Sequence, residues 1–192
     1  MKTGISFLFL AALFLIAGQN LFAQDNALAQ KAFVDYMTPG KMQNMLAKNA
    51  GRWQTKFKLW TAPGANPIVA EGNMIAETLL DGRYLQSKHS ANVNGMPMMG
   101  IGLDAYDNGR KIFVSTWIDN LSTGIMTLEG SFDEGTRTFT YTGKSYDPAA
   151  GKEVPVKEIL RYIDDDHQIM EMFTIQGNNE IKTMEVEMTR IK

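Results

Sequence analysis

Residues 107–120 read DNGRKIFVSTWIDN and contain one complete strand between two turns. Asp, Asn and Gly tolerate the left-handed backbone of a tight reversal, and the β-branched and aromatic residues between them favour an extended strand. Similar turn clusters recur at nearly even spacing toward the C-terminus, at residues 133–135, 147–148, 164–166 and 177–179. This spacing predicts an antiparallel meander that reverses direction many times.

The hydrophobic pattern also has a period of two upstream of this stretch. Trp53, Thr55 and Phe57 alternate with polar or charged residues, which is typical of a half-buried strand. Asp81-Gly82 is the signal of a tight hairpin. The predicted strands, about ten in all, cover residues 51–59, 68–80, 83–92, 96–106, 111–118, 125–132, 136–146, 154–163, 168–176 and 181–191.

Ten sequential antiparallel strands are too many for an open sheet with two bare edges, and closure into a barrel removes those edges. We therefore expect an all-β fold, an antiparallel up-and-down barrel over residues 51–192. A barrel of this size is filled by side chains or holds one small ligand. Helical spacing over residues 26–37, and Thr38-Pro39 as a helix start, predict one or two short helices within residues 24–50.

Residues 1–23 have the features of a secretory signal peptide. Lys2 supplies the positive charge, residues 5–17 form an apolar run of about 13 residues, and Ala23 favours cleavage before Gln24. The run is shorter than the ~20 residues that span a bilayer, although retention as a membrane anchor is the alternative. We expect an exported protein, periplasmic or secreted, with no transmembrane segment in the mature chain.

The composition excludes several classes of protein. The chain has no cysteine, so it has neither disulfides nor a lipid-anchoring thiol. Its 19 lysines and arginines against 21 acids form no run longer than two, which excludes a nucleic-acid footprint. His89 and His167 lack the spacing of zinc ligands, so we predict no metal site and no cofactor. His89 alone has the chemistry of a haem ligand, but a lone histidine on a strand is usually structural.

Two resemblances extend this reading. Gly51-Arg52-Trp53, together with Arg190 on the last strand, resembles the Gly-x-Trp and C-terminal arginine signature of the lipocalin and fatty-acid-binding superfamily. The resemblance implies a calycin-like barrel in which Trp53 packs at the closed end and Arg190 lies across it. Gly51, Trp53 and Arg190 are therefore expected to have a structural role in barrel closure.

The mature chain also resembles a bacterial family, domain of unknown function 1579. That resemblance implies the barrel and no established activity. The matching stretches are residues 50–53, 80–85, 100–102, 106–107, 115–120, 130–133, 184–186 and 189–190.

The candidate ligand-binding residues follow from strand phase and strand ends. Trp117, Asp119 and Asn120 end a strand, where an aromatic ring, a carboxylate and an amide are expected at a barrel mouth. The alternative is an Asx turn with Trp117 in the core. Met126, on a strand face expected to be interior, and Tyr141 are further candidates.

Glu171 alternates with Ile169 and Phe173, so one interpretation places it inside the barrel, paired with a cation or bound to the polar head of a ligand. The other interpretation places Met170 and Met172 inside and leaves Glu171 in solvent.

Three functions are compatible with these residues. The leading one is binding of an apolar or amphipathic small molecule inside an exported barrel. The second is a structural or interaction module of the cell envelope with a filled barrel. The third is an enzyme using Asp119, Glu171 or a tyrosine such as Tyr106 or Tyr141; no serine nucleophile motif or recognisable triad is present, so catalysis is the least favoured.

Overall fold

The computed structural model describes residues 26–192, so the predicted signal peptide and its cleavage site lie outside the described residues. The chain divides into two compact units, Met1–Thr38 and Pro39–Lys192. In the first unit, residues 26–37 form a helix with exposed side chains, and Lys31 pairs with Asp35 one turn later. The second unit contains one short helix and all the strands.

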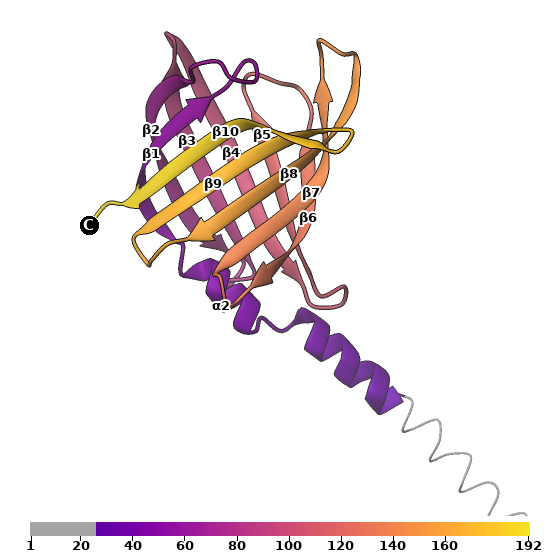
Figure 1. The fold of residues 1–192 in the computed structure, drawn as a ribbon. Coiled ribbons are helices and arrows are strands. Elements are labelled where there is room, and N and C mark those ends of the chain that lie inside the picture. The colour runs from indigo at the N-terminus through magenta and orange to yellow at the C-terminus, as the bar shows by residue number, and fades with distance from the viewer. Residues whose placement is uncertain (1–25) are drawn as a thin grey trace, which may run out of the picture. The chain divides into compact units, whose positions relative to one another are not determined.

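The second unit is a closed barrel of ten antiparallel strands (Figure 1). The strand order around the barrel is β1-β10-β9-β8-β7-β6-β5-β4-β3-β2, so sequential strands are neighbours and the first pairs with the last. This is the predicted all-β up-and-down barrel. The elements are α2 (Lys41–Ala47), β1 (Gly51–Leu59), β2 (Ile68–Leu79), β3 (Tyr84–Val93), β4 (Met96–Asp107), β5 (Ile112–Asp119), β6 (Met126–Asp133), β7 (Thr138–Asp147), β8 (Lys152–Tyr162), β9 (His167–Gln176) and β10 (Asn179–Arg190).

Aspartates fix several of the turns between these strands. Asp107 Oδ1 accepts hydrogen bonds from the backbone N–H groups of Gly109 and Arg110, at 2.8 and 3.0 Å. Asp133 and Asp147 cap their own turns in the same way. The side chain thus supplies the local hydrogen bonds that a reversing backbone needs, which is why these clusters end strands.

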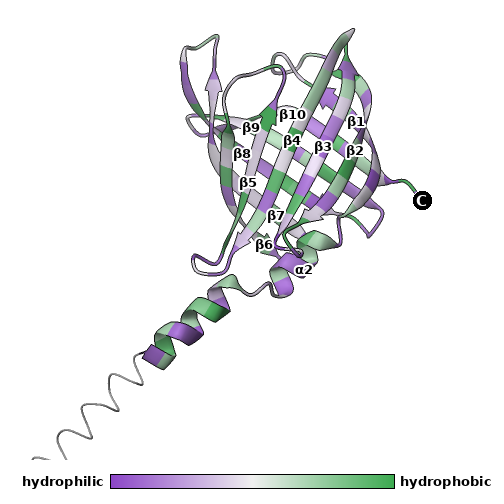
Figure 2. Ribbon diagram, turned by 180° about the vertical axis from the view of Figure 1, so that it is seen from behind, coloured by the Kyte–Doolittle hydropathy of each residue, from purple (hydrophilic) through white to green (hydrophobic). Residues whose placement is uncertain are grey.

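The two faces of each strand differ in polarity, as the alternating colours along the strands show (Figure 2). On β1, Trp53, Thr55 and Phe57 are buried, whereas Gln54 and Lys56 between them are exposed. Burial of one face of every strand gives a single core inside the barrel.

One end of the barrel is closed by α2 and by the contact between β1 and β10. Trp53 is fully buried, and the guanidinium of Arg190 lies 4.2 Å from the centroid of its ring. Arg190 Nη1 donates to the carbonyl of Ala50, Nη2 to that of Lys48 and Nε to that of Asp165, at 2.8, 2.9 and 3.1 Å. The cation therefore joins the helix linker, the last strand and the β8–β9 turn.

Gly51 makes this approach of Arg190 possible. Its φ of 144° is a conformation that L side chains rarely adopt, and a Cβ there would lie 2.6 Å from Arg190 Nη1. Leu46 of α2 is buried in the same core as Trp53. Between residues 26 and 192, no helix is long and apolar enough to cross a membrane.

Candidate functional site: the barrel interior

The barrel encloses a cavity of about 410 Å³. Leu46 of α2 lines it at the closed end, and Leu121 of the β5–β6 loop lines it at the other. Leu121 is also 57% exposed, so the cavity reaches the loop end of the barrel. Most of the lining is apolar, and flexible thioether side chains are prominent in it: Met74, Met98, Met126, Met170, Met172, Met184 and Met188.

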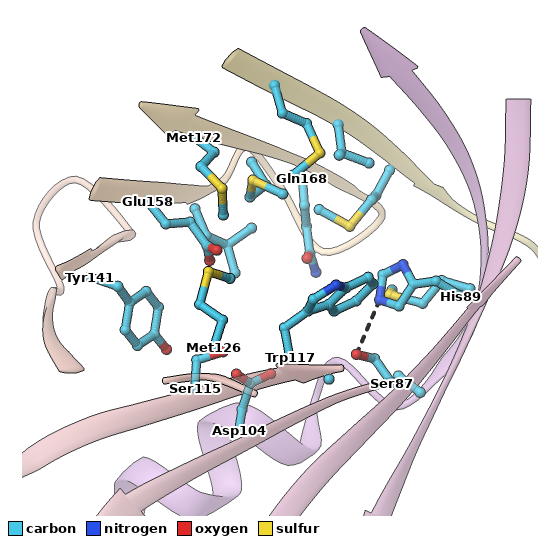
Figure 3. Close-up of a pocket in the computed structure, with 18 of the residues that line it drawn as sticks. Ser87, His89, Asp104, Ser115, Trp117, Met126, Tyr141, Glu158, Gln168 and Met172 are labelled. Atoms are coloured by element: carbon cyan, nitrogen blue, oxygen red, sulfur yellow. Dashed lines mark hydrogen bonds between the residues drawn. The ribbon is translucent and has the colours of Figure 1, made fainter. Parts of the chain in front are cut away.

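Two carboxyl groups point into this cavity from opposite strand pairs (Figure 3). Asp104 of β4 lies opposite Ser115 of β5 in the strand register. Glu158 of β8 lies opposite Tyr141 of β7. The side chains of Asp104 and Glu158 are half-buried, and both line the barrel interior (Figure 3). We call these four residues the acid cluster.

Removal from water dominates the titration of the acid cluster. Burial raises the pKa of Glu158 to about 8, and the nearby charge of Asp104 raises it further in the same direction. Burial also raises the pKa of Asp104 to about 6, against the opposing hydrogen bond from Ser115. At pH 7, Asp104 is therefore largely ionised and Glu158 largely protonated.

A second polar group of residues lines the cavity on β3 and β5. His89 Nε2 lies 3.1 Å from Ser87 Oγ, and its ring packs edge-on against Trp117 with centroids 5.1 Å apart. Trp117 Nε1 donates to Asp119 Oδ2 at 2.7 Å. Burial lowers the pKa of His89 to about 4, so its ring is neutral at pH 7. His89 Nδ1 is buried with no hydrogen-bond partner among the described residues.

The charges that face the cavity are all of one sign. Its lining includes the three carboxyl groups of Asp104, Asp119 and Glu158 and, among the described residues, no lysine or arginine. Partial burial acts to raise the pKa of Asp119. Hydrogen bonds from Trp117, Ser122 and the backbone outweigh this effect and hold the pKa below its ordinary value. Over residues 26–192, no group of three or more metal-ligating side chains is assembled.

Four of the residues predicted for a ligand site line the cavity: Trp117, Asp119, Met126 and Tyr141. Asp119 combines the two alternatives considered for it, because its Oδ1 accepts the backbone N–H of Leu121 in an Asx turn while Oδ2 binds Trp117. Asn120 does not line the cavity. Its side chain accepts from Met99 N at 2.7 Å and donates to Pro97 O at 2.9 Å, which fixes the end of β5 to β4.

The assignment of Glu171 to the barrel interior is corrected by the structure. Met170 and Met172 line the cavity, so the period-two alternation of β9 turns Glu171 to the outer face. There its carboxylate pairs with Arg161 of β8 and Lys182 of β10. The strand phase is that of the second interpretation, but Glu171 is not left in solvent, because it is only 9% exposed beside Arg161 and Lys182.

Asp104 and Glu158 were not recognised from sequence, although strand phase contained a signal for one of them. Glu158 alternates with Val156, Leu160 and Tyr162, a face that is otherwise apolar or aromatic. An acid in phase with such residues is directed into the core. Asp104 follows Gly100 and Gly102 on its face, and glycines give no indication of which face is buried.

The fold and its interior define the class of protein: a small, closed, ten-stranded antiparallel barrel with a largely apolar central cavity. The chain belongs to the family of proteins of unknown function DUF1579, whose model matches residues 38–190. No curated protein matches the chain.

Solved structures similar to this barrel include the following two. Rv2717c from M. tuberculosis is 12% identical, with a TM-score of 0.60 over 81% of this chain and 100% of that chain. A redesigned β-barrel is 14% identical, with a TM-score of 0.41 over 80% of this chain and 100% of that one. The similarity to Rv2717c shows a shared fold.

Proposed function

We propose that this protein is a small exported β-barrel that binds an apolar or amphipathic small molecule in its interior. The observation that carries the proposal is the cavity of about 410 Å³ inside the barrel. Small-molecule sites typically enclose about 300–1,000 Å³, with mostly apolar walls and a few convergent polar groups. The methionine-rich walls, the acid cluster and the pair of Trp117 and Asp119 fit that description.

The cavity favours ligand binding over a filled structural barrel. Protein interiors are close-packed, and atoms that line an empty space lose dispersion contacts. The same barrel packs densely at its closed end, where Phe113, Phe132, Phe139 and Tyr162 make ring contacts with centroid distances of 4.5–6.2 Å. Phe139 and Tyr162 of this cluster also line the cavity, so the aromatic packing at the closed end forms one of its walls.

Filling the cavity with a larger side chain tests the proposal. In Met126→Trp the indole would occupy space that Met126 now borders (Figure 3). We expect the neutral fluorescent dye N-phenyl-1-naphthylamine to bind the wild-type protein, and its affinity to fall by about tenfold or more in the variant. Thr127→Trp is the matched control, because Thr127 is the next residue of β6 and is exposed on the outer face.

Equal dye affinity in the wild type and both variants would contradict binding inside the barrel. The ligand itself is sought by native mass spectrometry of the protein purified from its own host. A bound mass that is present in the wild type and in Thr127→Trp but missing from Met126→Trp would support the proposal.

Export is the second part of the proposal, and it is supported by the features of residues 1–23. N-terminal sequencing of the protein isolated from its host should give a mature chain that begins at Gln24. A cytoplasmic protein that begins at Met1 would contradict export.

A second candidate function is acid–base catalysis on a molecule held in the cavity. Its motivation is the acid cluster, where one carboxyl group is largely ionised and the other largely protonated at pH 7, the division that acid–base pairs use. Deuterium incorporation into the host-derived ligand during incubation in heavy water would support it. No incorporation above that of Glu158→Gln would exclude proton transfer by this group.

A further inference from the structure

We propose that the cavity selects amphipathic amines over fatty acids, with the cationic head of the ligand beside Asp104 and Glu158 and its hydrocarbon among the methionines. This inference rests on the proposed function, since it assigns a chemical class to the ligand of the same cavity.

The distribution of charge inside the barrel is the main argument. The described residues that line the cavity contribute three carboxyl groups and no lysine or arginine. A carboxylate ligand would enter a site of its own charge with no cation to pair with, and an unpaired buried charge is costly. A protonated amine would meet the opposite situation, because its charge and its N–H donors match carboxylate acceptors.

Glu158 adds an independent observation, because its carboxyl group is left without a partner. Within residues 26–192, no hydrogen bond or ion pair to the side chain of Glu158 is present, although the side chain points into the cavity (Figure 3). The chain treats another glutamate differently: Glu171 on the outer face is paired with both Arg161 and Lys182. Glu158 is half-buried, and the unpaired carboxyl group faces the open cavity, so it is accessible to a partner from outside the chain.

The protonation states support the same assignment. Asp104 is largely ionised at pH 7 and supplies a negative charge, while Glu158 is a proton donor that a bound cation would help to ionise. Among the described residues that line the cavity, His89 is the one basic side chain. Its ring is neutral at that pH because burial lowers its pKa. Nothing in the lining offsets the charge of Asp104.

An organic cation fits the cavity better than a metal ion does. No group of three or more metal-ligating residues is assembled in the described part of the chain. The walls around the acid cluster are thioethers and hydrocarbon, for example Met126 and Met172, which match an alkyl chain. Cationic head and apolar body are the two properties of an amphipathic amine.

A headgroup series on one hydrocarbon chain tests the inference. Decylamine, decanol and decanoate are each used to displace N-phenyl-1-naphthylamine from the full-length protein at pH 7. We expect decylamine to bind about tenfold or more tightly than decanoate, with decanol between them. The three ligands share a chain, so differences among them report the headgroup.

Neutral variants then locate the selecting charge. In Asp104→Asn/Glu158→Gln the advantage of decylamine over decanoate should fall by about tenfold, while the affinity for decanol changes by less than about threefold. Glu153→Gln is the control, because Glu153 is an exposed acid on the same strand as Glu158. The headgroup series on the wild-type protein remains decisive if the double variant fails to fold.

The outcomes separate this inference from the proposed function. If decanol binds but decanoate binds as tightly as decylamine or more tightly, amine selection is wrong and binding in the interior stands. If the double variant keeps the full preference for decylamine, the acid cluster is not the selecting group and the inference is overturned. If none of the three ligands displaces the dye, this inference fails, while the dye affinities of the wild type and Met126→Trp decide the proposed function separately.

Discussion

At the scale of single residues, the position of Trp117 depends on the absence of a side chain at Gly100. The two residues lie on adjacent strands, and a Cβ at Gly100 would overlap the indole ring of Trp117. The ring therefore rests directly on the β4 backbone, where its Nε1 reaches Asp119 and the ring makes a T-shaped contact with His89. One glycine thus sets the shape of this wall of the cavity.

Gly100→Ala is predicted to destabilise the protein by about 1–3 kcal/mol, because overpacking forces a buried ring out of its preferred position. Urea unfolding gives the free energy, and the dye affinity reports the displaced cavity wall. Gly124→Ala is the matched control, since a Cβ at Gly124 meets no atom within 4 Å. Equal stability in the two variants would show that Trp117 does not depend on Gly100.

At the scale of elements, Arg190 connects parts of the chain that are far apart in sequence. Its guanidinium bonds to carbonyls of residues 48 and 50 before β1 and to that of residue 165 in the β8–β9 turn, and it covers the ring of Trp53. These contacts fix the ends of β1 and β10, the two strands whose pairing closes the barrel. Because the acceptors are backbone carbonyls, only a side chain with several donors in a fork can serve them all.

Arg190→Gln should therefore lower the free energy of unfolding by about 2–4 kcal/mol, through the loss of charge-assisted hydrogen bonds and of the contact with Trp53. Thermal and urea unfolding measure this loss. Arg52→Gln removes an exposed arginine from the same strand as Trp53 and should change stability by less than about 0.5 kcal/mol. A loss of similar size in both variants would argue against a closing role for Arg190.

At the scale of the whole molecule, the acid cluster makes stability depend on pH. Glu158 has a higher pKa in the folded protein than in the unfolded chain, so the folded protein keeps the proton of Glu158 up to a higher pH than the unfolded chain does. The folded state is then favoured at low pH, and stability is lost as pH rises through about 8. The raised pKa of Asp104 likewise makes stability fall as pH rises from about 4 to 6. Over the same interval the lowered pKa of His89 makes stability rise with pH, so the two effects oppose each other.

Between pH 7 and 8.5 Glu158 dominates, because folded Asp104 has by then largely lost its proton and His89 has largely lost its proton in both the folded and the unfolded state. We predict that the free energy of unfolding of the wild-type protein falls by about 1–2 kcal/mol across this window. The fall should disappear in Glu158→Gln and persist in the exposed control Glu153→Gln. Urea titrations at several pH values measure it, and a fall that survives in Glu158→Gln would assign it to another group.

The sequence determined the barrel. Turn residues and period-two alternation are local properties, so they located all ten strands to within a few residues and indicated closure. The closing roles of Trp53 and Arg190 were implied by the resemblance to the Gly-x-Trp signature, and the structure has the contact between them. Trp117, Asp119 and Met126 followed from phase and strand ends, Tyr141 was a further candidate, and all four line the cavity.

The tertiary structure alone decided which acids share the interior. Glu171 and Glu158 both alternate with apolar neighbours, yet Glu171 faces Arg161 and Lys182 outside while Glu158 faces the cavity. Local pattern cannot separate the two, because both faces of β9 carry hydrophobic residues and only barrel closure defines the inner one. Asp104 and Glu158 come from β4 and β8, more than 50 residues apart in sequence, and only the closed sheet brings them to one cavity.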